Sequence, residues 1–373
     1  MKIRTVEPFI LHVPIEQKNI SDASNTISHW GVVGAKITTD TGIVGYGYTG
    51  THAELAGDQA IVHVIGATFA PLLIGENPLE VNTLWHKMFN HAPMRWIGRS
   101  GITHLAIGAI DVALWDIKSK SADQPLWQFL GGATMDELEA YNTDIGWMSN
   151  SLDRLVKLSS EAVHEQGFRR LKLKVGHANI NDDVDRIAAV RKAVGRNIPI
   201  AVDANGKWDL ATAIRFCKRA EDLDIFWLEE PLWYDDVESH RKLSEASSIP
   251  IALGEQLYSV DAFAHFMANN AMCYAQPDIT RLAGISEYLR VADLAYGYRM
   301  PVVAHVGDMG QVHVHLSYYH EMTTMLEYIP WIKRCFEEPI KVENGVYAKP
   351  QNPGAGTTLL TSAMEEFGKP VRI

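Results

Sequence analysis

From Gly131 onward, short apolar runs of strand length alternate with longer segments whose apolar residues recur at helical spacing. Strands that alternate with helices in this way pair in parallel, and eight of them within about 200 residues predict a closed β/α barrel. An open doubly wound sheet is the alternative, but it would gather its functional groups at one switch point. Most of the runs here end in an ionisable residue, which favours the closed barrel. The predicted strands are residues 138–145, 169–175, 198–204, 224–230, 249–255, 272–278, 300–306 and 324–329.

The chain before the barrel has another pattern, with β-like segments first and helical segments after them. Residues 32–50 predict a β-hairpin with a tight Asp-Thr-Gly turn, and residues 101–122 carry apolar side chains at helical spacing. Residues 15–30 are polar and lack periodicity, so we expect a mobile lid there. The tail is rich in Pro and Gly and is expected to pack on the first domain. The predicted units are an α+β capping domain (1–130), the barrel (131–328) and the C-terminal segment (329–373).

Composition narrows the class of protein further. With 47% hydrophobic and 21% charged residues, the 373-residue chain is typical of a globular protein with a large core. Its net charge of −11 argues against nucleic-acid and membrane-surface partners. The three cysteines form no CxxC pair, so we expect neither disulfides nor a thiolate zinc site, and a reducing cytoplasm is the expected location. We find no signal peptide and expect no membrane-spanning run.

Three acidic residues stand at equal intervals in the predicted barrel. Asp203, Glu229 and Glu255 are each 26 residues apart, and each ends a strand candidate. This interval is about one β/α unit, so the three carboxylates should meet at the carboxyl ends of successive strands, where barrel enzymes hold their active sites. Oxygen ligands of this kind suit Mg²⁺, with Mn²⁺ as the alternative.

Other strand ends add groups that transfer protons. Lys172 and Lys174 lie two residues apart on a strand and therefore share a face, where each positive charge should lower the pKa of the other lysine. His305 follows the seventh strand candidate. Each motif alone has an ordinary interpretation: solvated lysines, turn-capping acids or a core histidine. Their recurrence at one depth around one barrel favours a catalytic site.

Other motifs are weaker. Residues 45–50 fit GxGxxG, but they lie in the predicted hairpin and no second βα unit follows, so we interpret them as a twisted strand and not as a nucleotide site. His313 and His315 are interpreted as helix surface or local packing, because no matching zinc ligands accompany them. Glu229 and Glu230 are adjacent, so only one is expected to face the site.

Taken together, the strand-end motifs resemble the enolase superfamily, mandelate racemase subgroup. Within that subgroup the chain is most similar to acid-sugar dehydratases of the galactarate/talarate type, and nearly as similar to sugar-acid cycloisomerases. The resemblance implies a modified (β/α)7β TIM barrel with an N-terminal capping domain completed by the C-terminal tail, and often a homo-oligomer. The motifs are KLKVG (172–176), VDAN (202–205), WLEEP (227–231), LGEQ (253–256), QPD (276–278), AH (304–305) and LE (326–327).

The resemblance also implies roles for the residues. The three acids would bind Mg²⁺, and Lys174 would be the base on one face of the substrate, with Lys172 lowering its pKa. His305, oriented by Asp278, would act on the opposite face. Glu327 would hydrogen-bond the substrate carboxylate, and Asn205 would be a secondary contact. Further candidates for substrate contact, from the lid, the first domain and the first barrel strand, are His29, Trp30, Arg99, Tyr141 and Asn142.

The implied reaction begins with removal of the proton α to a carboxylate. Dehydration of an aldonate or aldarate to a 2-keto-3-deoxy acid is the leading hypothesis, which makes the protein a lyase. A racemase, epimerase or cycloisomerase is the runner-up. The chain departs from the dehydratase pattern in residues 305–315, which are about two residues longer, and in Arg281-Leu282-Ala283, which replaces a glycine-rich turn.

Two hypotheses lie outside this chemistry. A metal-dependent aldose isomerase or aldolase would use the acids but leave the lysine pair unexplained. A non-catalytic sugar-acid-binding protein would bind its ligand without exchanging the α-proton.

Overall fold

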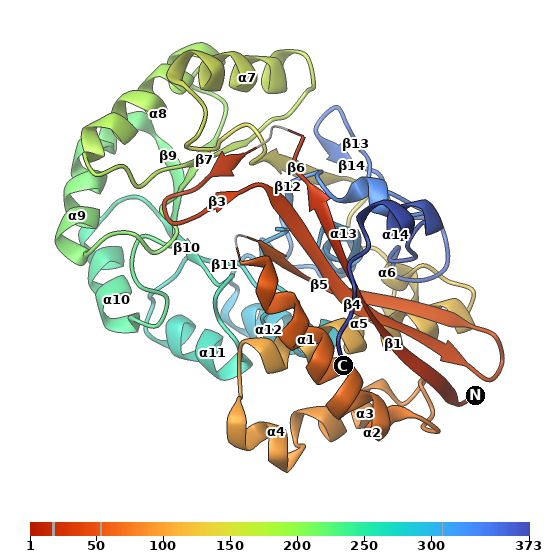
Figure 1. The fold of residues 1–373 in the computed structure, drawn as a ribbon. Coiled ribbons are helices and arrows are strands. Elements are labelled where there is room, and N and C mark those ends of the chain that lie inside the picture. The colour runs from red at the N-terminus through yellow and green to blue at the C-terminus, as the bar shows by residue number, and fades with distance from the viewer. Residues whose placement is uncertain (17–18, 53, 308) are drawn as a thin grey trace.

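The structure is a computed structural model that describes residues 1–16, 19–52, 54–307 and 309–373. Its larger part is a barrel of parallel strands surrounded by helices (Figure 1). The strands pair in the order β11-β10-β9-β8-β7-β6, and β12 pairs with β6. The strands are β6 (Leu138–Asn142), β7 (Leu171–Lys174), β8 (Ile200–Asp203), β9 (Ile225–Glu229), β10 (Ile251–Leu253), β11 (Tyr274–Ala275) and β12 (Leu326–Tyr328).

The seventh position of the barrel is thinner than the sequence predicted. We expected a strand over 300–306, but only Val302 forms bridges there, to Ala275 on one side and Thr323 on the other. These bridges still close the ring between β11 and β12. With a helix after each of the first seven positions, the predicted (β/α)7β barrel is confirmed. The helices are α7 (Leu152–His164), α8 (Ile180–Val194), α9 (Leu210–Arg219), α10 (Val237–Ala246), α11 (Val260–Ala268), α12 (Ile285–Tyr298) and α13 (Gly310–Tyr319).

The barrel strands are short because polar residues end them and begin the next helix. Capping side chains accept backbone hydrogen bonds at the helix starts, which satisfies N–H groups that lack a partner within the helix. The capping residues are Ser151 in α7, Asn179 in α8, Asp209 in α9, Asp236 in α10 and Ser259 in α11.

The barrel interior is filled by an apolar layer, whose residues lie two or three positions before the polar residues of the site. Tyr141 packs edge-on against Trp227 with ring centroids 5.4 Å apart. Because this layer is closed by side chains, the polar residues that end the strands are held at one depth above it. The layer consists of Tyr141, Ala201, Trp227, Ala252, Val303 and Met325.

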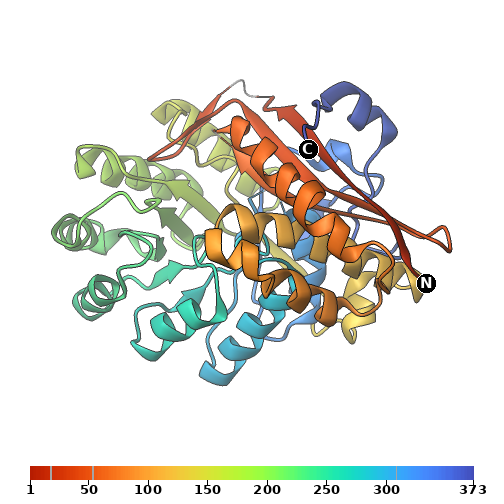
Figure 2. The ribbon, with the colours of Figure 1, turned by 60° about the horizontal axis from the view of Figure 1, so that its bottom comes forward.

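The capping domain begins with an antiparallel sheet, β1 (Ile3–Pro14), β4 (His29–Thr39) and β5 (Val44–His52). The predicted hairpin is confirmed as β4–β5, with Gly42 in its turn at φ +87°. Helices cover one face of this sheet (Figure 2). Those that contact the sheet are α1 (Asp58–His63), a π-helical turn (Val64–Phe69), α2 (Ala70–Leu73) and α5 (Ile102–Ser121). The other helices of the domain are α3 (Val81–Phe89), α4 (Ala92–Ile97) and α6 (Leu126–Leu130).

The glycines of the GxGxxG motif bring α5 close to β5. A Cβ atom at Gly47 would lie 2.0 Å from the carbonyl oxygen of Ala109, and one at Gly45 would lie 2.4 Å from that of Ala113. Both contacts are far closer than van der Waals distance, so only glycine fits. The motif lies in β5, as the strand interpretation predicted, and its glycines serve helix–sheet packing.

The predicted lid contains a small hairpin, β2 (Ile20–Ser21) with β3 (Thr26–Ile27). The carbonyl oxygen of Ser21 accepts a hydrogen bond from the Met148 amide at 2.8 Å, and the side chain of Ala23 packs on Gly176 just after β7. The hairpin thus lies over one end of the barrel. Residues 17–18 of the predicted lid lie outside the described residues.

The C-terminal segment contacts both domains. It forms β13 (Val342–Glu343), β14 (Val346–Tyr347) and α14 (Thr361–Phe367), and β14 pairs with β6 of the barrel. Beyond α14, the Lys369 amide donates to the Ile10 carbonyl of β1 at 2.9 Å. The tail therefore joins the barrel to the capping sheet, a wider role than packing on the first domain alone.

One helical stretch in the described residues, Leu55–Leu73, is long and apolar enough to cross a membrane by length and composition alone, although we expected no such run. Buried helices of a protein core can have the same length and apolar composition. Ile61, Val62, Ile65 and Phe69 of this stretch are buried in the capping-domain core. Packing within the domain accounts for its apolar face.

A buried carboxylate links the capping domain to the barrel. Asp111 of α5 accepts hydrogen bonds from the Ser286 amide at 2.9 Å and the Ser286 hydroxyl at 2.7 Å. The Ser286 hydroxyl in turn accepts from the Trp115 indole at 3.1 Å, and the Trp85 indole donates to the Ala283 carbonyl at 2.8 Å. Burial raises the pKa of Asp111 to about 7.

The Asp111 carboxyl should make stability depend on pH. Its folded-state pKa of about 7 exceeds the usual value of 3.8, so between these values the folded protein holds a proton that the unfolded chain has released. The contribution of Asp111 to the free energy of unfolding should therefore fall as pH rises from about 4 to 7, by an amount on the order of 4 kcal/mol. In Asp111→Asn this contribution should be absent, so the pH slope should differ from that of the wild type. Urea unfolding at several pH values measures it, and an unchanged pH slope in the variant would contradict the assignment.

Candidate active site

The structure brings the three evenly spaced carboxylates together at one end of the barrel. Asp203 ends β8, Glu229 ends β9 and Glu255 follows β10, and one carboxylate oxygen from each lies within 4.8 Å of the others. Asp203 and Glu229 are fully buried. Oε2 of Glu255 is also buried and makes no hydrogen bond in the described part of the chain, although Nε2 of His305 lies 3.3 Å from it. Three converging oxygen donors, one of them unsatisfied, fit a hard divalent cation.

Lys172 provides the positive charge that holds these acids close. Its side chain is fully buried, with Nζ 2.7 Å from Glu229, 2.6 Å from Glu327 and 3.6 Å from Asp203. Burial by itself would lower the pKa of Lys172, but Glu229 and Glu327 raise it well above the usual value. The group is therefore a permanent cation and a structural counter-charge.

Lys174 points to the same side from the end of β7. Its Nζ lies 2.5 Å from Asp203 and 5.4 Å from the ring centroid of Trp147. We expected Lys172 to lower the pKa of Lys174. Burial and Lys172 do act in that direction, but Asp203 and Glu255 outweigh them, so the pKa is raised in the protein alone. A cation bound by the same carboxylates would remove this effect.

His305 approaches the acids from another direction. Its Nδ1 lies 2.7 Å from Asp278, and its Nε2 lies 3.3 Å from Glu255. Burial would lower the pKa of His305, but Glu255, Asp278 and Glu327 raise it to about 9. Gly307 packs on the imidazole, where a Cβ would lie 2.8 Å from Cε1. Because Asp278 takes Nδ1–H, Nε2 is the atom that faces the site.

Glu327 is more enclosed than a substrate-binding group was expected to be. It is fully buried and accepts hydrogen bonds from the Thr143 hydroxyl at 2.7 Å and the Val306 amide at 3.0 Å, besides its contact with Lys172. Burial would raise the pKa of Glu327, but Lys172 and His305 hold it far below the usual range. The Glu327 carboxylate therefore contacts both Lys172 and the backbone beside His305.

The Glu229–Glu230 pair divides as expected, with only Glu229 in the carboxylate trio. Glu230 is buried beside it at φ +38°, and its Oε2 has no partner among the described residues. Burial and then Glu255 raise the pKa of Glu230 well above its usual value. The backbone N–H of Asn205 donates a hydrogen bond to Oδ1 of Asp203 at 2.9 Å and orients that carboxylate.

The five further candidates for substrate contact are placed differently from one another. Trp30 is buried, while His29 is half-buried and bonds Ser28 at 3.0 Å. Tyr141 lies in the apolar layer beneath the site, with its ring 5.8 Å from Lys172. Asn142 is buried at the end of β6. Arg99 is exposed in a shallow hollow of the α4–α5 turn, and no recorded hydrogen bond or ion pair of the described residues joins it to the carboxylates.

Sequence reasoning missed groups that the capping domain and loops supply. His52, at the end of β5, stacks on Trp30 with ring centroids 4.9 Å apart. Burial and then Arg281 lower the pKa of His52 to about 4, and its electrostatic neighbours also include His305 and Lys174. These residues end no barrel strand, so the strand-end pattern could not find them.

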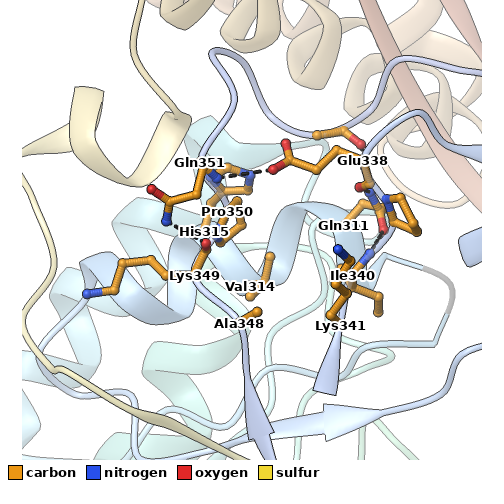
Figure 3. A pocket seen from close by; sticks show the side chains of 12 residues that line it. Gln311, Val314, His315, Glu338, Ile340, Lys341, Ala348, Lys349, Pro350 and Gln351 are labelled. Atoms are coloured by element: carbon orange, nitrogen blue, oxygen red, sulfur yellow. Dashed lines mark hydrogen bonds between the residues drawn. The ribbon is translucent and has the colours of Figure 1, made fainter. Parts of the chain in front are cut away.

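The two histidines of α13 do not form a zinc site. Among the described residues, the only group of acids, histidines or cysteines arranged to hold a metal is the carboxylate trio. His313 and His315 are both fully buried, so the packing interpretation is confirmed and the helix-surface alternative is wrong. A hollow of about 170 Å³ beside His315 lies between α13 and the C-terminal segment (Figure 3), and no member of the carboxylate trio lines it.

The fold and these groups define a class: a β/α-barrel enzyme with a carboxylate metal centre flanked by a lysine and a histidine. Residues 154–363 match the model for the enolase C-terminal domain-like family, and residues 5–131 match the mandelate racemase / muconate lactonizing enzyme N-terminal domain. The chain therefore belongs to the enolase superfamily, in its mandelate racemase branch.

Several relatives are named as enzymes of sugar acids. The chain is 34% identical to L-talarate/galactarate dehydratase of Salmonella typhimurium over 95% of this chain and 88% of the relative. It is 28% identical to 3,6-anhydro-alpha-L-galactonate cycloisomerase of Streptomyces coelicolor over 96% and 97%. The crystal structure of the Salmonella dehydratase with Mg and L-lyxarohydroxamate superposes with a TM-score of 0.91, at 33% identity, over 99% of this chain and 93% of that one.

The buried counter-charge should dominate the stability of the metal-free protein. Lys172→Met leaves Glu229 and Glu327 buried without their cation, which should cost roughly 3–5 kcal/mol. Lys174→Met is the matched control and should cost less, because Lys174 has its close contact with one carboxylate only. Denaturant unfolding in chelator measures both. Equal losses would contradict this account, and Glu327→Gln combined with Lys172→Met should recover part of the loss.

Proposed function

We propose that the protein is a Mg²⁺-dependent acid-sugar dehydratase. It converts an aldonate or aldarate to a 2-keto-3-deoxy acid by loss of water. The proposal rests on one observation: two groups able to transfer protons contact different carboxylates of the trio. Lys174 contacts Asp203 at 2.5 Å, whereas His305 contacts Glu255 at 3.3 Å. The similarity to a talarate/galactarate dehydratase supports the same conclusion.

Asp203, Glu229 and Glu255 would hold the cation. Their oxygen donors, close spacing and buried unsatisfied Glu255 Oε2 fit Mg²⁺, the metal in the related dehydratase structure. When bound, the cation would supply positive charge that stabilises the negative charge developing on the substrate carboxylate.

Lys174 and His305 would move the protons. One of them removes the α-proton, the choice depending on which face of the substrate presents it, and His305 Nε2–H protonates the departing 3-hydroxyl as water. The resulting enol tautomerises to the 2-keto acid. Lys172 stays charged and adds to the stabilisation of the enediolate. Asp278 holds the imidazole with Nε2 toward the substrate.

Substrate selection is proposed to involve the capping domain. The β2–β3 hairpin covers the barrel end, and Trp30 and His52 stack nearby. Of the sequence candidates, Trp30, His29 and Asn142 remain proposed contacts, whereas Tyr141 is proposed to support Lys172 from below. Arg99 would meet a distal carboxylate only if the α4–α5 turn moved.

An isomerase is the second candidate, and the cycloisomerase relative favours it. It would use the same first step, with return of a proton or closure of a ring in place of water loss. The product separates the two reactions, because an isomerase forms no 2-keto-3-deoxy acid from a hydroxy acid.

A screen of mono- and diacid sugars with Mg²⁺ in D₂O tests the reaction. We expect a 2-keto acid together with loss of the α-proton signal. Lys174→Ala and His305→Asn should each lower turnover by about 10²–10⁴-fold while the circular dichroism spectrum is retained. Exchange without 2-keto acid would favour the isomerase. Normal turnover by Lys174→Ala would exclude the proposed mechanism.

Thermal unfolding tests the metal site without a substrate. Mg²⁺ should raise the melting temperature, and the increase should continue roughly with the logarithm of its concentration above Kd, because it binds only the folded trio. Glu255→Gln should abolish this increase. Glu230→Gln is the control, since Glu230 is the neighbouring buried carboxyl outside the trio. A full Mg²⁺ response in Glu255→Gln, or its loss in Glu230→Gln, would contradict the ligand assignment.

A further inference from the structure

The turn that carries Asp278 is held in place by a buried histidine that the proposed reaction does not use. The Ile279 amide donates a hydrogen bond to Nε2 of His313 at 3.3 Å. Asp278 itself accepts the Thr280 amide at 2.7 Å on one oxygen and bonds His305 at 2.7 Å on the other. His313 therefore holds the peptide group that joins Asp278 to Ile279, within the turn that orients the Asp278 carboxylate.

Several contacts lock the His313 ring. It is fully buried and packs against the ring of Tyr288 with centroids 5.7 Å apart. Burial lowers the pKa of His313 to about 4, so the ring is neutral. Because Nε2 accepts the Ile279 hydrogen, the ring proton resides on Nδ1. The Ile279 amide is the one hydrogen-bond partner of the ring, because Nδ1 is buried with none among the described residues.

The same helix contains a matched residue with a different role. His315 is equally buried, and its Nδ1 accepts the Trp127 amide at 3.3 Å. Figure 3 shows His315 beside the C-terminal segment, among residues that line the hollow there. The two histidines thus make the same kind of hydrogen bond at the same length, but only His313 bonds the turn of the Asp278–His305 pair.

We propose that His313 is a positioning residue, which keeps the Asp278 carboxylate in line with His305 by accepting the Ile279 amide hydrogen. Without this acceptor the buried Ile279 N–H loses its partner, and the turn shifts to find another. The Asp278 carboxylate then moves relative to Nδ1 of His305, and the imidazole no longer holds Nε2 toward the substrate. Every step that uses His305 should slow, whereas exchange of an α-proton by Lys174 should not, because Lys174 is held by a separate strand and by Asp203.

Three variants separate positioning from packing. His313→Phe keeps a buried ring but removes the acceptor. His313→Gln places an amide oxygen close to the position of Nε2 and should restore it. His315→Phe removes the equivalent acceptor on the other side of the same helix, so it reports what a general loss of α13 stability does.

Hydrogen exchange of the holoenzyme tests the turn itself and needs no substrate. In His313→Phe the segment containing Ile279 should exchange about tenfold faster, the effect of one lost hydrogen bond. His313→Gln and His315→Phe should leave that segment near the wild-type rate. Unchanged exchange in His313→Phe, or an equal increase in His315→Phe, would overturn the positioning role even if the proposed function is correct.

The catalytic test rests on the proposed function and compares two epimeric sugar acids in D₂O. His313→Phe should lower kcat at least tenfold for the epimer whose α-proton faces His305, with KM changed less than twofold. Exchange of the α-proton that faces Lys174 should stay within twofold of wild type, and His313→Gln should restore kcat for the other epimer. Equal losses on both faces would show a structural role only. If no sugar acid reacts with the wild type, the proposed function fails, and the exchange experiment still decides the role of His313.

Discussion

A buried ammonium group is the constraint on which this active site depends. Four strand ends present Asp203, Glu229, Lys172 and Glu327 to one another inside the barrel, and carboxylates this close repel strongly in a medium of low dielectric constant. Lys172 contacts all three acids, so it makes their approach possible. Lys172 does not contact Glu255, whose carboxylate completes the trio, and three converging carboxylates are the electrostatic reason that a divalent cation suits the site.

The two sides of the site rest on different supports. Lys174 contacts Asp203 and Trp147, and Trp147 packs on Trp331, which packs on Trp30 of the capping sheet. His305 depends on loops at the carboxyl ends of the sixth and seventh barrel positions and on α13 behind them. An enzyme that acts on both faces of a substrate needs two such supports, and a substitution in one of them can affect one face selectively.

Much of the fold and of the central site followed from the sequence because the barrel repeats a local unit. The 26-residue spacing of the acids, the lysine pair two residues apart and the strand-end histidine each follow from one β/α unit or one strand. Groups outside that repeat were missed: His52 comes from the capping sheet, and Arg281 from a loop. The length of the seventh strand was overestimated. Its apolar residues are buried, but only Val302 forms bridges to neighbouring strands.

The sequence by itself determined the class of fold, the residues at each strand end and the chemistry that they favour, because strand period and β/α repeat are local properties of the chain. Only the tertiary structure decided that Glu229 and not Glu230 joins the trio, that the pKa of Lys174 is raised, and that His313 and His315 bond different segments. Each of these depends on distances between residues far apart in the chain, and electrostatic interactions and hydrogen bonds change steeply with such distances.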